Sequence, residues 1–180
     1  HLIKKTNNPE SKFQLDITED FVNFLENSDA QKIMFGVTFA LLKLAEKGIK
    51  LKNTIIIETG GMKGRGKELT RSQLHKVLQE ELKPKAIHSE YGMTELLSQA
   101  YLKDSVFKCP PWMKIFLREA TDPFTIKKNG KGVINLIDLA NINSCSFIAT
   151  DDLGKLNIDG SFEVLGRLDY TQIRGCNLLI

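Results

Sequence analysis

The stretch Thr54-Ile55-Ile56-Ile57-Glu58-Thr59-Gly60-Gly61 decides the fold class of this 180-residue chain. Its run of β-branched residues favours a strand covered on both faces, as in a parallel α/β sheet. A glycine-rich segment follows, and residues 70–82 then carry helix signals, with Thr70 as cap and Pro84 just after the end. Residues 86–91 are predicted to be a short strand or a loop. The order strand, loop, helix, strand is typical of a βαβ unit and so predicts a parallel sheet.

Three further helices are predicted on either side of this unit. Thr18, followed by two acidic residues, indicates a helix start. Apolar residues at helical spacing predict a helix over residues 29–47, capped by Ser28 or Asp29 and ended by Gly48. Residues 94–102 are also predicted to be helical.

The pattern of residues along the sequence changes near Cys109-Pro110-Pro111. Short β-type runs separated by turn signals such as Asn129-Gly130 and Asp159-Gly160 follow it, which favours a unit built from hairpins. The runs are residues 113–117, 132–138, 146–149, 154–158 and 161–165. We therefore predict the end of a parallel-sheet α/β subdomain, followed by a small β-rich subdomain in the form of a distorted barrel.

Composition excludes several classes of protein. Lys and Arg number 25 against 22 Asp and Glu, and a net charge of +3 is too small for a nucleic-acid-binding surface. We find no apolar run of about 18 residues for a membrane span, and no signal peptide. Three cysteines without a CxxC pair favour a reduced, cytoplasmic setting. Because the chain starts at His1, we expect it to be processed, tagged or cut from something longer.

A glycine-rich segment spanning Gly61 to Lys67 has the G-x-x-x-x-G-K spacing of a phosphate-binding loop. Lys67 and backbone N–H groups would hold phosphate at a helix N-terminus, and Asp138 would be a metal-binding strand end. Glu68, however, stands where a hydroxyl should ligate Mg²⁺, and a carboxylate there repels phosphate. The favoured interpretation is a basic glycine turn.

Two further groups of residues suit nucleotide chemistry. In Tyr91-Gly92-Met93-Thr94-Glu95, an aromatic face suits a purine, Gly92 admits a ligand to the backbone, and a hydroxyl and a carboxylate suit phosphate and Mg²⁺. The alternative is a plain capped helix start. Thr150-Asp151-Asp152-Leu153-Gly154 and Gly166-Arg167-Leu168-Asp169 are, taken singly, hairpin turns rich in Asp and Gly. A carboxylate can nevertheless accept both ribose hydroxyls, and a neighbouring arginine can assist it.

Taken together and in order, these blocks resemble the adenylate-forming superfamily of acyl-CoA synthetases, peptide-synthetase adenylation domains and luciferases. The chain is most similar to its acyl-protein synthetase and phenylacetate-CoA ligase branch. The four blocks are Glu58-Thr59-Gly60-Gly61, the Y-G-x-T-E block at residues 91–95, the T-G-D-x-G block at residues 150–154 with Asp151 in place of its glycine, and a hinge block formed by residues 166–169 with Ile173-Arg174-Gly175.

The resemblance implies a role for each matching position. Tyr91 would stack on adenine, with Gly60, Gly61 and Gly92 close to the nucleotide. Asp152 would bind both ribose hydroxyls, assisted by Arg167.

For the chemistry, the resemblance implies that Thr94 contacts the α-phosphate and that Glu95 binds Mg²⁺. Asp169 would be the hinge about which a small C-terminal domain moves. Cys176 would be the acyl acceptor, or alternatively a small packing residue. His88 would line an acyl pocket, or else be a hydrogen-bonded loop histidine.

The implied reaction converts a fatty or aryl carboxylic acid and ATP into an acyl-adenylate, and then transfers the acyl group to a thiol. ATP or AMP and Mg²⁺ are the implied cofactors, and coenzyme A, a carrier protein or a cysteine the implied acceptor. Neither the loop that grips the β- and γ-phosphates nor the C-terminal lysine of the superfamily is matched. We therefore expect residues 1–105 to end an α/β subdomain, 106–166 to be β-rich and 167–180 to be hinge.

Such a chain is either a fragment, inactive alone, or a naturally short protein, and a homodimer or a companion chain is expected to cover its apolar surface. Two alternatives stay open at this point. One is a phosphate-loop nucleotide-binding protein that uses residues 61–67. The other is a non-catalytic module that retains an adenylate pocket.

Overall fold

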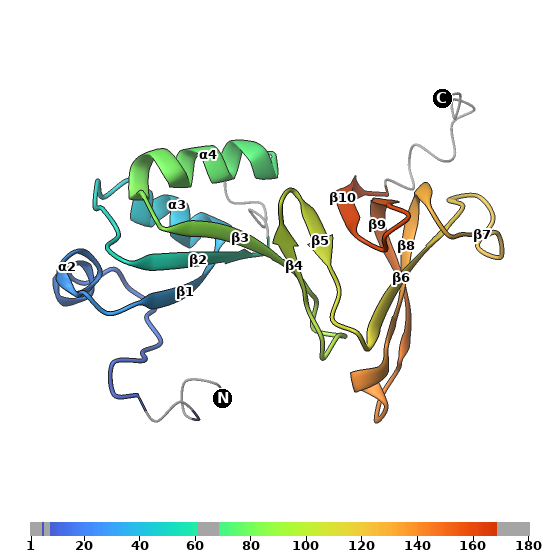
Figure 1. Ribbon diagram of the computed structural model, residues 1–180, viewed down its shortest axis with the longest axis horizontal. Coiled ribbons are helices and arrows are strands. Elements are labelled where there is room, and N and C mark those ends of the chain that lie inside the picture. Colours follow the sequence, from blue (N-terminus) through green and yellow to red (C-terminus); the bar gives the residue numbers. More distant parts are fainter. Residues whose placement is uncertain (1–4, 6–7, 61–68, 169–180) are drawn as a thin grey trace. The chain divides into compact units, whose positions relative to one another are not determined.

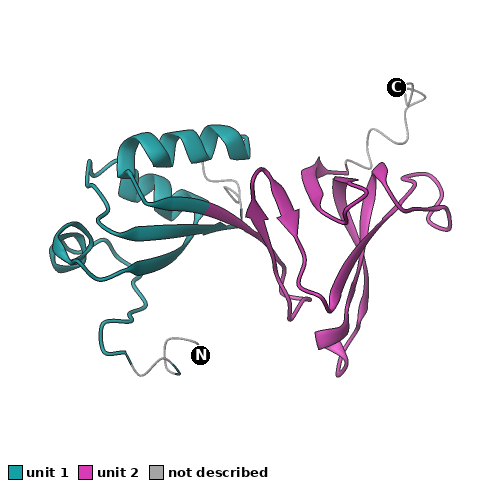
Figure 2. Ribbon diagram, viewed as in Figure 1, with its two compact units in different colours: residues 1–87 teal, residues 88–180 magenta. Residues whose placement is uncertain are grey.

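The computed structural model describes residues 5, 8–60 and 69–168, which divide between two compact units, residues 1–87 and 88–180 (Figure 2). The fold class is mixed α/β, with a mixed sheet that is partly parallel. The domain boundaries predicted at residues 105 and 166 stay predictions.

The first unit contains a parallel βαβ arrangement (Figure 1). Strand β1 (Lys32–Val37) pairs in parallel with β2 (Thr54–Thr59), in a register that runs from Lys32 opposite Thr54 to Val37 opposite Thr59. Helix α3 (Thr38–Ala45) lies between them in sequence, as a parallel pair requires of its crossover. The predicted parallel sheet is thereby confirmed.

Two other helices among the described residues of this unit begin where the sequence predicts. Helix α2 (Glu19–Asn27) is capped by Thr18, whose hydroxyl accepts the Phe21 N–H. Helix α4 (Arg71–Leu82) is capped by Thr70, which forms a reciprocal capping box with Gln73.

The helix predicted over residues 29–47 is wrong in its first half. Residues 32–37 form β1, and the helix begins only at Thr38. Ser28 is the C-cap of α2 instead of an N-cap. Apolar residues such as Ile33 and Val37 also suit a strand, and pairing with β2 overrides their helical spacing.

One face of the parallel strands carries the core of this unit. Ile56 is fully buried and joins one apolar cluster with leucines of α3 and α4, which lie on the same side of the strands in Figure 1. On the other face Ile55 and Ile57 are only half-buried, and Ile33 and Phe35 are 61% and 54% exposed. The expected cover on both faces is therefore incomplete among the described residues.

The second unit is an antiparallel array, which confirms the predicted β-rich half. Strand β3 (Ala86–Tyr91) crosses the boundary between the units. The strands that follow are β4 (Ala100–Lys103), β5 (Val106–Lys108), β6 (Met113–Arg118), β7 (Ile126–Lys127), β8 (Gly130–Asp138), β9 (Phe147–Leu156) and β10 (Phe162–Arg167), with a 3₁₀ turn, η1 (Leu139–Asn141), after β8.

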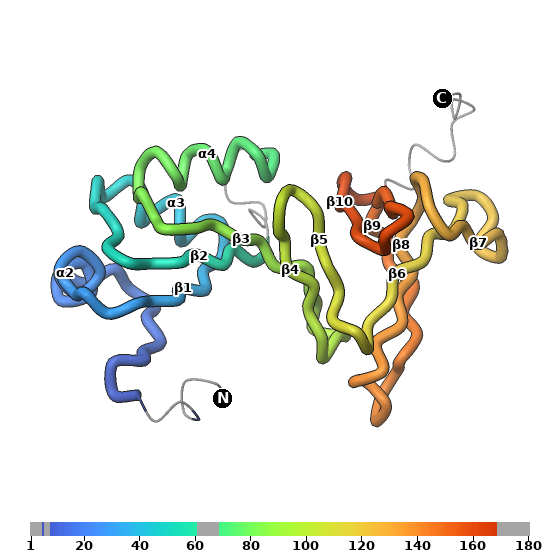
Figure 3. The backbone as a smooth tube through the Cα atoms, in the orientation of Figure 1, coloured from blue at the N-terminus to red at the C-terminus, as the bar shows by residue number. Residues whose placement is uncertain are grey.

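The strands follow one another across the sheet in the hydrogen-bonded order β1-β2-β3-β4-β5-β10-β9-β8-β6-β7. The long strands β8 and β9 run side by side in Figure 3, from Gly130 opposite Leu156 to Ile137 opposite Phe147. The barrel form of this half stays a prediction.

The helix predicted over residues 94–102 is wrong. Residues 94–99 form turns and bends, and Ala100–Lys103 is β4. Burial alternates along β4, with Ala100 and Leu102 inside and Tyr101 and Lys103 outside, and this is the period of a strand. A short apolar run such as this fits both periodicities, and pairing with β5 settles it.

Three aromatic rings form the centre of the core of the second unit. Phe107 and Phe162 are fully buried and stacked, with ring centroids 5.3 Å apart. The Tyr91 ring meets Phe162 edge-on, also at 5.3 Å, and Phe107 at 5.9 Å. Such contacts add to the free energy gained by burial alone.

None of the helices that the structure describes is long and apolar enough to cross a membrane.

We expect Phe162→Ala to destabilise the protein by about 3–5 kcal/mol, because it removes a fully buried ring and leaves a cavity. Urea unfolding measures the change. Phe124→Ala is the matched control, since the Phe124 side chain is 92% exposed and its loss is expected to cost less than about 0.5 kcal/mol. Equal losses for both variants would contradict this description of the core.

Candidate functional site

The Tyr91 side chain connects the core of the second unit to a polar cluster. Its ring lies among Phe107 and Phe162, and the residue is 8% exposed. Its hydroxyl donates a hydrogen bond of 2.8 Å to Asp152 Oδ2. The end of β3 and the middle of β9, 61 residues apart in sequence, therefore meet at this bond.

Asp152 lies at an irregularity of β9 and not in a hairpin turn. The register with β8 shifts between Val133 and Asn135, so that residues 150–152 face Ile134 alone. The Thr150 hydroxyl donates to the Ile134 carbonyl at 2.9 Å and accepts the Asp152 N–H at 3.1 Å. The predicted turn over residues 150–154 is thus wrong, because the segment is a bulge inside a strand, and bulges re-aim side chains near sites.

Asp151, which stands where the T-G-D-x-G block of the superfamily has its glycine, fits this backbone. The non-glycine residues with positive φ in the described ranges are Asn53, Lys83, Asp104 and Ser105. Asp151 therefore adopts a conformation open to any L-residue. Gly154, by contrast, has no room for a side chain, because an added Cβ would lie 2.7 Å from the Ile134 side chain and 2.9 Å from the Glu163 carbonyl oxygen.

A second bulge, in β10, places Arg167 opposite Asp152. The register with β9 shifts between Val164 and Gly166, and Gly166 has a φ of +153°, which favours glycine. Arg167 Nε lies 3.5 Å from Asp152 Oδ1. Because the Arg167 side chain is 82% exposed, this ion pair contributes little to stability and leaves the guanidinium available to a ligand.

The cluster leaves acceptor capacity on the Asp152 carboxylate. An ionised carboxylate offers about four lone-pair sites, and among the described residues Tyr91 and Arg167 occupy one on each oxygen. The Asp152 side chain is 18% exposed, so solvent or a ligand reaches it. A half-buried carboxylate with free lone pairs and a flanking arginine is suited to accept two hydroxyl groups.

Burial raises the pKa of the Tyr91 hydroxyl well above its usual value, and the charge and hydrogen bond of Asp152 raise it further. Tyr91 is therefore protonated at every physiological pH and remains a donor to Asp152. Its small exposed fraction leaves little of the ring for a ligand, and stacking on adenine stays a prediction.

Thr94 and Glu95 lie together in an exposed turn, so the alternative of a capped helix start is wrong. The turn is closed by the Leu96 N–H, which donates to the Met93 carbonyl at 3.1 Å. Both side chains point to solvent, while Leu96 is buried. No group of three or more metal-ligating side chains occurs in the part of the chain that the structure describes. Glu95 nevertheless fits Mg²⁺, which is bound by one or two carboxylates together with waters and substrate phosphates.

The remaining predicted site residues fall elsewhere. Gly60 lies in the first unit, exposed after the end of β2. Gly92 is exposed beside Tyr91 in sequence. Gly61, Asp169 and Cys176 lie outside the described residues, as does the glycine-rich segment from Gly61 to Lys67.

Three polar residues that support the site were not predicted as such from sequence. Arg118 Nη2 donates to the Thr150 carbonyl at 2.9 Å and lies 4.0 Å from Asp151 Oδ1. Asn141 and Asp138 hold the segment that follows Glu95. Asp138, interpreted above as a possible metal ligand at a strand end, accepts its hydrogen bonds from protein groups. For these three residues, the one feature of the sequence that could have indicated a role is the position of Asp138 at the end of an apolar strand.

His88, for which two interpretations were open, and Trp112 both have protein partners. The His88 Nδ1 lies 3.0 Å from the Leu102 carbonyl oxygen, which fits the hydrogen-bonded histidine. The Trp112 indole N–H donates to Ser98 Oγ at 2.8 Å, and thereby has the partner that its chemistry requires.

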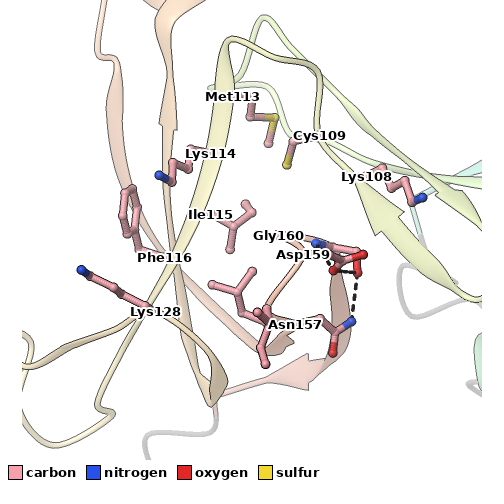
Figure 4. A pocket seen from close by; sticks show the side chains of 13 residues that line it. Lys108, Cys109, Met113, Lys114, Ile115, Phe116, Lys128, Asn157, Asp159 and Gly160 are labelled. Carbon is pink, nitrogen blue, oxygen red and sulfur yellow. Dashed lines mark hydrogen bonds between the residues drawn. The ribbon is translucent and has the colours of Figure 1, made fainter.

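A groove of about 540 Å³ in the second unit shares no residue with the Tyr91–Asp152–Arg167 cluster (Figure 4). Lys108, Cys109, Met113 and Ile158 are among its lining residues. Burial raises the pKa of the Cys109 thiol to about 11, so this cysteine is a weak nucleophile at neutral pH. The groove therefore adds nothing to the predicted chemistry.

We expect Tyr91→Phe to cost about 1.5–3 kcal/mol at pH 7, because it removes a hydrogen bond to a charged acceptor. Since folding raises the pKa of Tyr91, its contribution is full below the unfolded value near 10 and is lost as the pH rises above it. The deficit of the variant should therefore shrink between pH 10 and 12. Urea unfolding at pH 7 and pH 11 measures this.

Tyr101→Phe serves as the control for this experiment, because the Tyr101 residue is 39% exposed. It is expected to change stability less at both pH values. A Tyr91→Phe deficit that is the same at pH 7 and pH 11 would contradict the protonated donor assigned to Tyr91.

The fold is similar to that of solved enzymes. Similar structures include an amide bond synthetase from Marinactinospora thermotolerans (16% identity, TM-score 0.60, 88% of this chain and 35% of that chain covered). Another is an O-succinylbenzoate coenzyme A synthetase from Bacillus subtilis in complex with ATP and magnesium (20%, 0.57, 88% and 35%). A third is ATP-bound MatB from Rhodopseudomonas palustris (14%, 0.57, 83% and 33%). The chain spans about a third of the length of each.

No curated protein matches the sequence. Residues 5–180, however, match the family described as "Acyl-protein synthetase, LuxE", which covers nearly the whole chain. Because this match spans far more than half of its residues, the chain belongs to the LuxE acyl-protein synthetase family.

Proposed function

We propose that this protein activates a carboxylic acid with ATP, forming an acyl-adenylate and pyrophosphate, and that the acyl group then passes to a thiol with release of AMP. The observation that carries the proposal is the Asp152 carboxylate, held between the Tyr91 hydroxyl and the Arg167 guanidinium with lone pairs free. Family membership supports the reaction class.

In this proposal Asp152 accepts hydrogen bonds from both ribose hydroxyls of the nucleotide. Tyr91 fixes the carboxylate by donating to Oδ2, and Arg167 reaches the ribose or the α-phosphate. Gly92 lies close to the nucleotide, with Tyr91 stacked beside the adenine through the exposed part of its ring. Gly60 and Gly61 stay predicted nucleotide-binding residues.

Thr94 and Glu95 act on the phosphate side. The Thr94 hydroxyl donates to the α-phosphate, and the Glu95 carboxylate binds Mg²⁺, which supplies positive charge to the phosphates when it is bound. Both side chains are exposed in one turn, three and four residues after Tyr91 in the chain, which supports a shared ligand.

The substrate in this proposal is a fatty or aryl acid, and the acceptor is coenzyme A, a carrier protein or a cysteine such as Cys176. Asp169 is the hinge for movement between the two half-reactions. A second copy or a companion chain covers the apolar side chains of Ile33 and Phe35, which are exposed on β1. Since the chain spans about a third of its structural relatives, we propose that it is the C-terminal part of the large domain and is inactive alone.

We expect calorimetric titration of the full-length protein with AMP to give binding that Asp152→Ala weakens at least 10-fold. The reason is that each hydrogen bond to a charged group contributes about 1.5–3 kcal/mol. Asp151→Ala is the matched control: it removes the neighbouring carboxylate, which faces Arg118, and should leave AMP affinity within about twofold.

The same titration, together with an assay of carboxylate-dependent ATP turnover, separates the alternatives. Nucleotide binding that is indifferent to Asp152→Ala but lost on Lys67→Ala would favour a phosphate loop at residues 61–67 and contradict the proposal. AMP binding that depends on Asp152 without any carboxylate-dependent turnover of ATP would favour a non-catalytic module.

A further inference from the structure

The turn that carries Thr94 and Glu95 has no helix or strand to hold it, because residues 94–99 lie between β3 and β4. Two buried polar side chains from the end of β8 and from η1 hold it instead. Asp138 is fully buried and Asn141 is 4% exposed. Both direct their polar atoms at the backbone of residues 95–98.

Asp138 binds the segment just after Glu95. Its Oδ2 accepts the backbone N–H groups of Leu97, at 3.1 Å, and of Ser98, at 2.8 Å. Its Oδ1 accepts the Ser98 hydroxyl at 2.7 Å and the Ala140 N–H at 3.1 Å. Ser98 Oγ in turn accepts the Trp112 indole N–H, so the carboxylate and its partners form one connected network.

The Asp138 carboxylate stays ionised in this position. Burial alone would raise its pKa, but the hydrogen bonds from Ser98, Ala140 and Leu97 together lower it below the usual value. A fully buried carboxylate is costly unless its hydrogen bonds are satisfied, and here four donors satisfy it. The bonds hold Leu97 and Ser98 at a fixed distance from the end of β8.

Asn141 binds Glu95 itself. Its Nδ2 donates to the Glu95 carbonyl oxygen and, at 3.0 Å, to the Cys145 carbonyl oxygen. Its Oδ1 accepts the Ser144 hydroxyl at 2.8 Å, which orients the amide. The backbone of Glu95 is therefore anchored, while its side chain stays exposed.

A carboxylate that binds a metal has to be accessible, and the backbone that carries it has to be held in place. Glu95 meets both conditions, since its backbone is anchored and its side chain is exposed. A ligand must be held within about 0.5 Å of its productive position, and groups behind the ligand do this. The Glu95 turn is closed by Leu96 N–H to Met93 carbonyl, and Leu96 is buried. The anchor from Asn141 and the two amides bound by Asp138 complete its support.

We infer that Asp138 and Asn141 are positioning residues that aim Glu95 at the Mg²⁺ of a bound Mg·ATP. The inference rests on the proposed function. Asn141 acts on the Glu95 carbonyl and Asp138 on the two amides that follow, so that loss of either lets the turn move and weakens metal binding without touching the ribose site at Asp152.

The test measures the Mn²⁺ affinity of the ATP-bound full-length protein by electron paramagnetic resonance, and its AMP affinity in EDTA by calorimetry. Asn141→Ala is expected to weaken Mn²⁺ binding about 10- to 100-fold, the usual effect of removing a partner behind a metal ligand, and to leave AMP affinity unchanged. Asn157→Ala is the matched control. Among the described residues, the Asn157 side chain donates to Ser161 Oγ at 3.0 Å. Its loss should change neither the Mn²⁺ affinity nor the AMP affinity.

A double-mutant cycle with Glu95→Ala separates positioning from a general structural role. If Asn141 acts through Glu95, adding Asn141→Ala to Glu95→Ala weakens Mn²⁺ binding no further. An undiminished effect in the Glu95→Ala background would overturn the inference. If Asn141→Ala does not fold, Asn141→Ser gives the same test, because its shorter side chain cannot span the Glu95 and Cys145 carbonyls.

The two possible failures are distinguishable. Wild-type protein that binds no adenine nucleotide overturns the proposed function and the inference with it. Wild-type protein that binds AMP and, through Glu95, Mn²⁺, but whose Mn²⁺ affinity is unchanged by Asn141→Ala and by Asp138→Asn, overturns the inference alone.

Discussion

The hydrogen bond from the Tyr91 hydroxyl to the Asp152 carboxylate is the interaction on which the second unit depends. It joins the end of β3 to the middle of β9, and it connects the aromatic core of Phe107 and Phe162 to the surface. The core fixes the ring, the ring fixes the hydroxyl, and the hydroxyl fixes one oxygen of the carboxylate. A carboxylate set in this way needs little reorganisation when a ligand arrives.

The two carboxylates of this unit show how environment divides roles between chemically identical groups. Asp138 is sealed from solvent and bound by four protein donors, so it has nothing left to offer a ligand and serves as an anchor. Asp152 is partly exposed and keeps lone pairs free, so it can bind one. Both stand at the margins of regular strand pairing: Asp138 ends β8, and Asp152 lies in a bulge of β9.

Much of this arrangement was predictable from sequence, and the misses have physical causes. Local signals predicted β2, α4 and the hairpin runs, because caps, β-branched runs and glycine turns act over a few residues. The strand at residues 32–37 was interpreted as helix, since its pairing partner β2 lies beyond a whole helix in sequence. The strand at residues 100–103 was interpreted as helix because so short an apolar run fits both periodicities, and only its pairing with β5 settles it. The blocks at Tyr91, Asp152 and Arg167 were predictable from family resemblance, and the structure brings them together. Asn141 was not, because only the fold brings it to the Glu95 carbonyl.

The measurement that tests the central claim most directly is carboxylate-dependent exchange of labelled pyrophosphate into ATP by the full-length protein, across a panel of fatty and aryl acids. Formation of an acyl-adenylate predicts exchange that requires a particular acid and Mg²⁺ and is lost on Asp152→Ala, while Asp151→Ala retains it. Absence of exchange with every acid, in a protein that is folded and binds AMP, would contradict the claim that the Asp152 site supports acid activation.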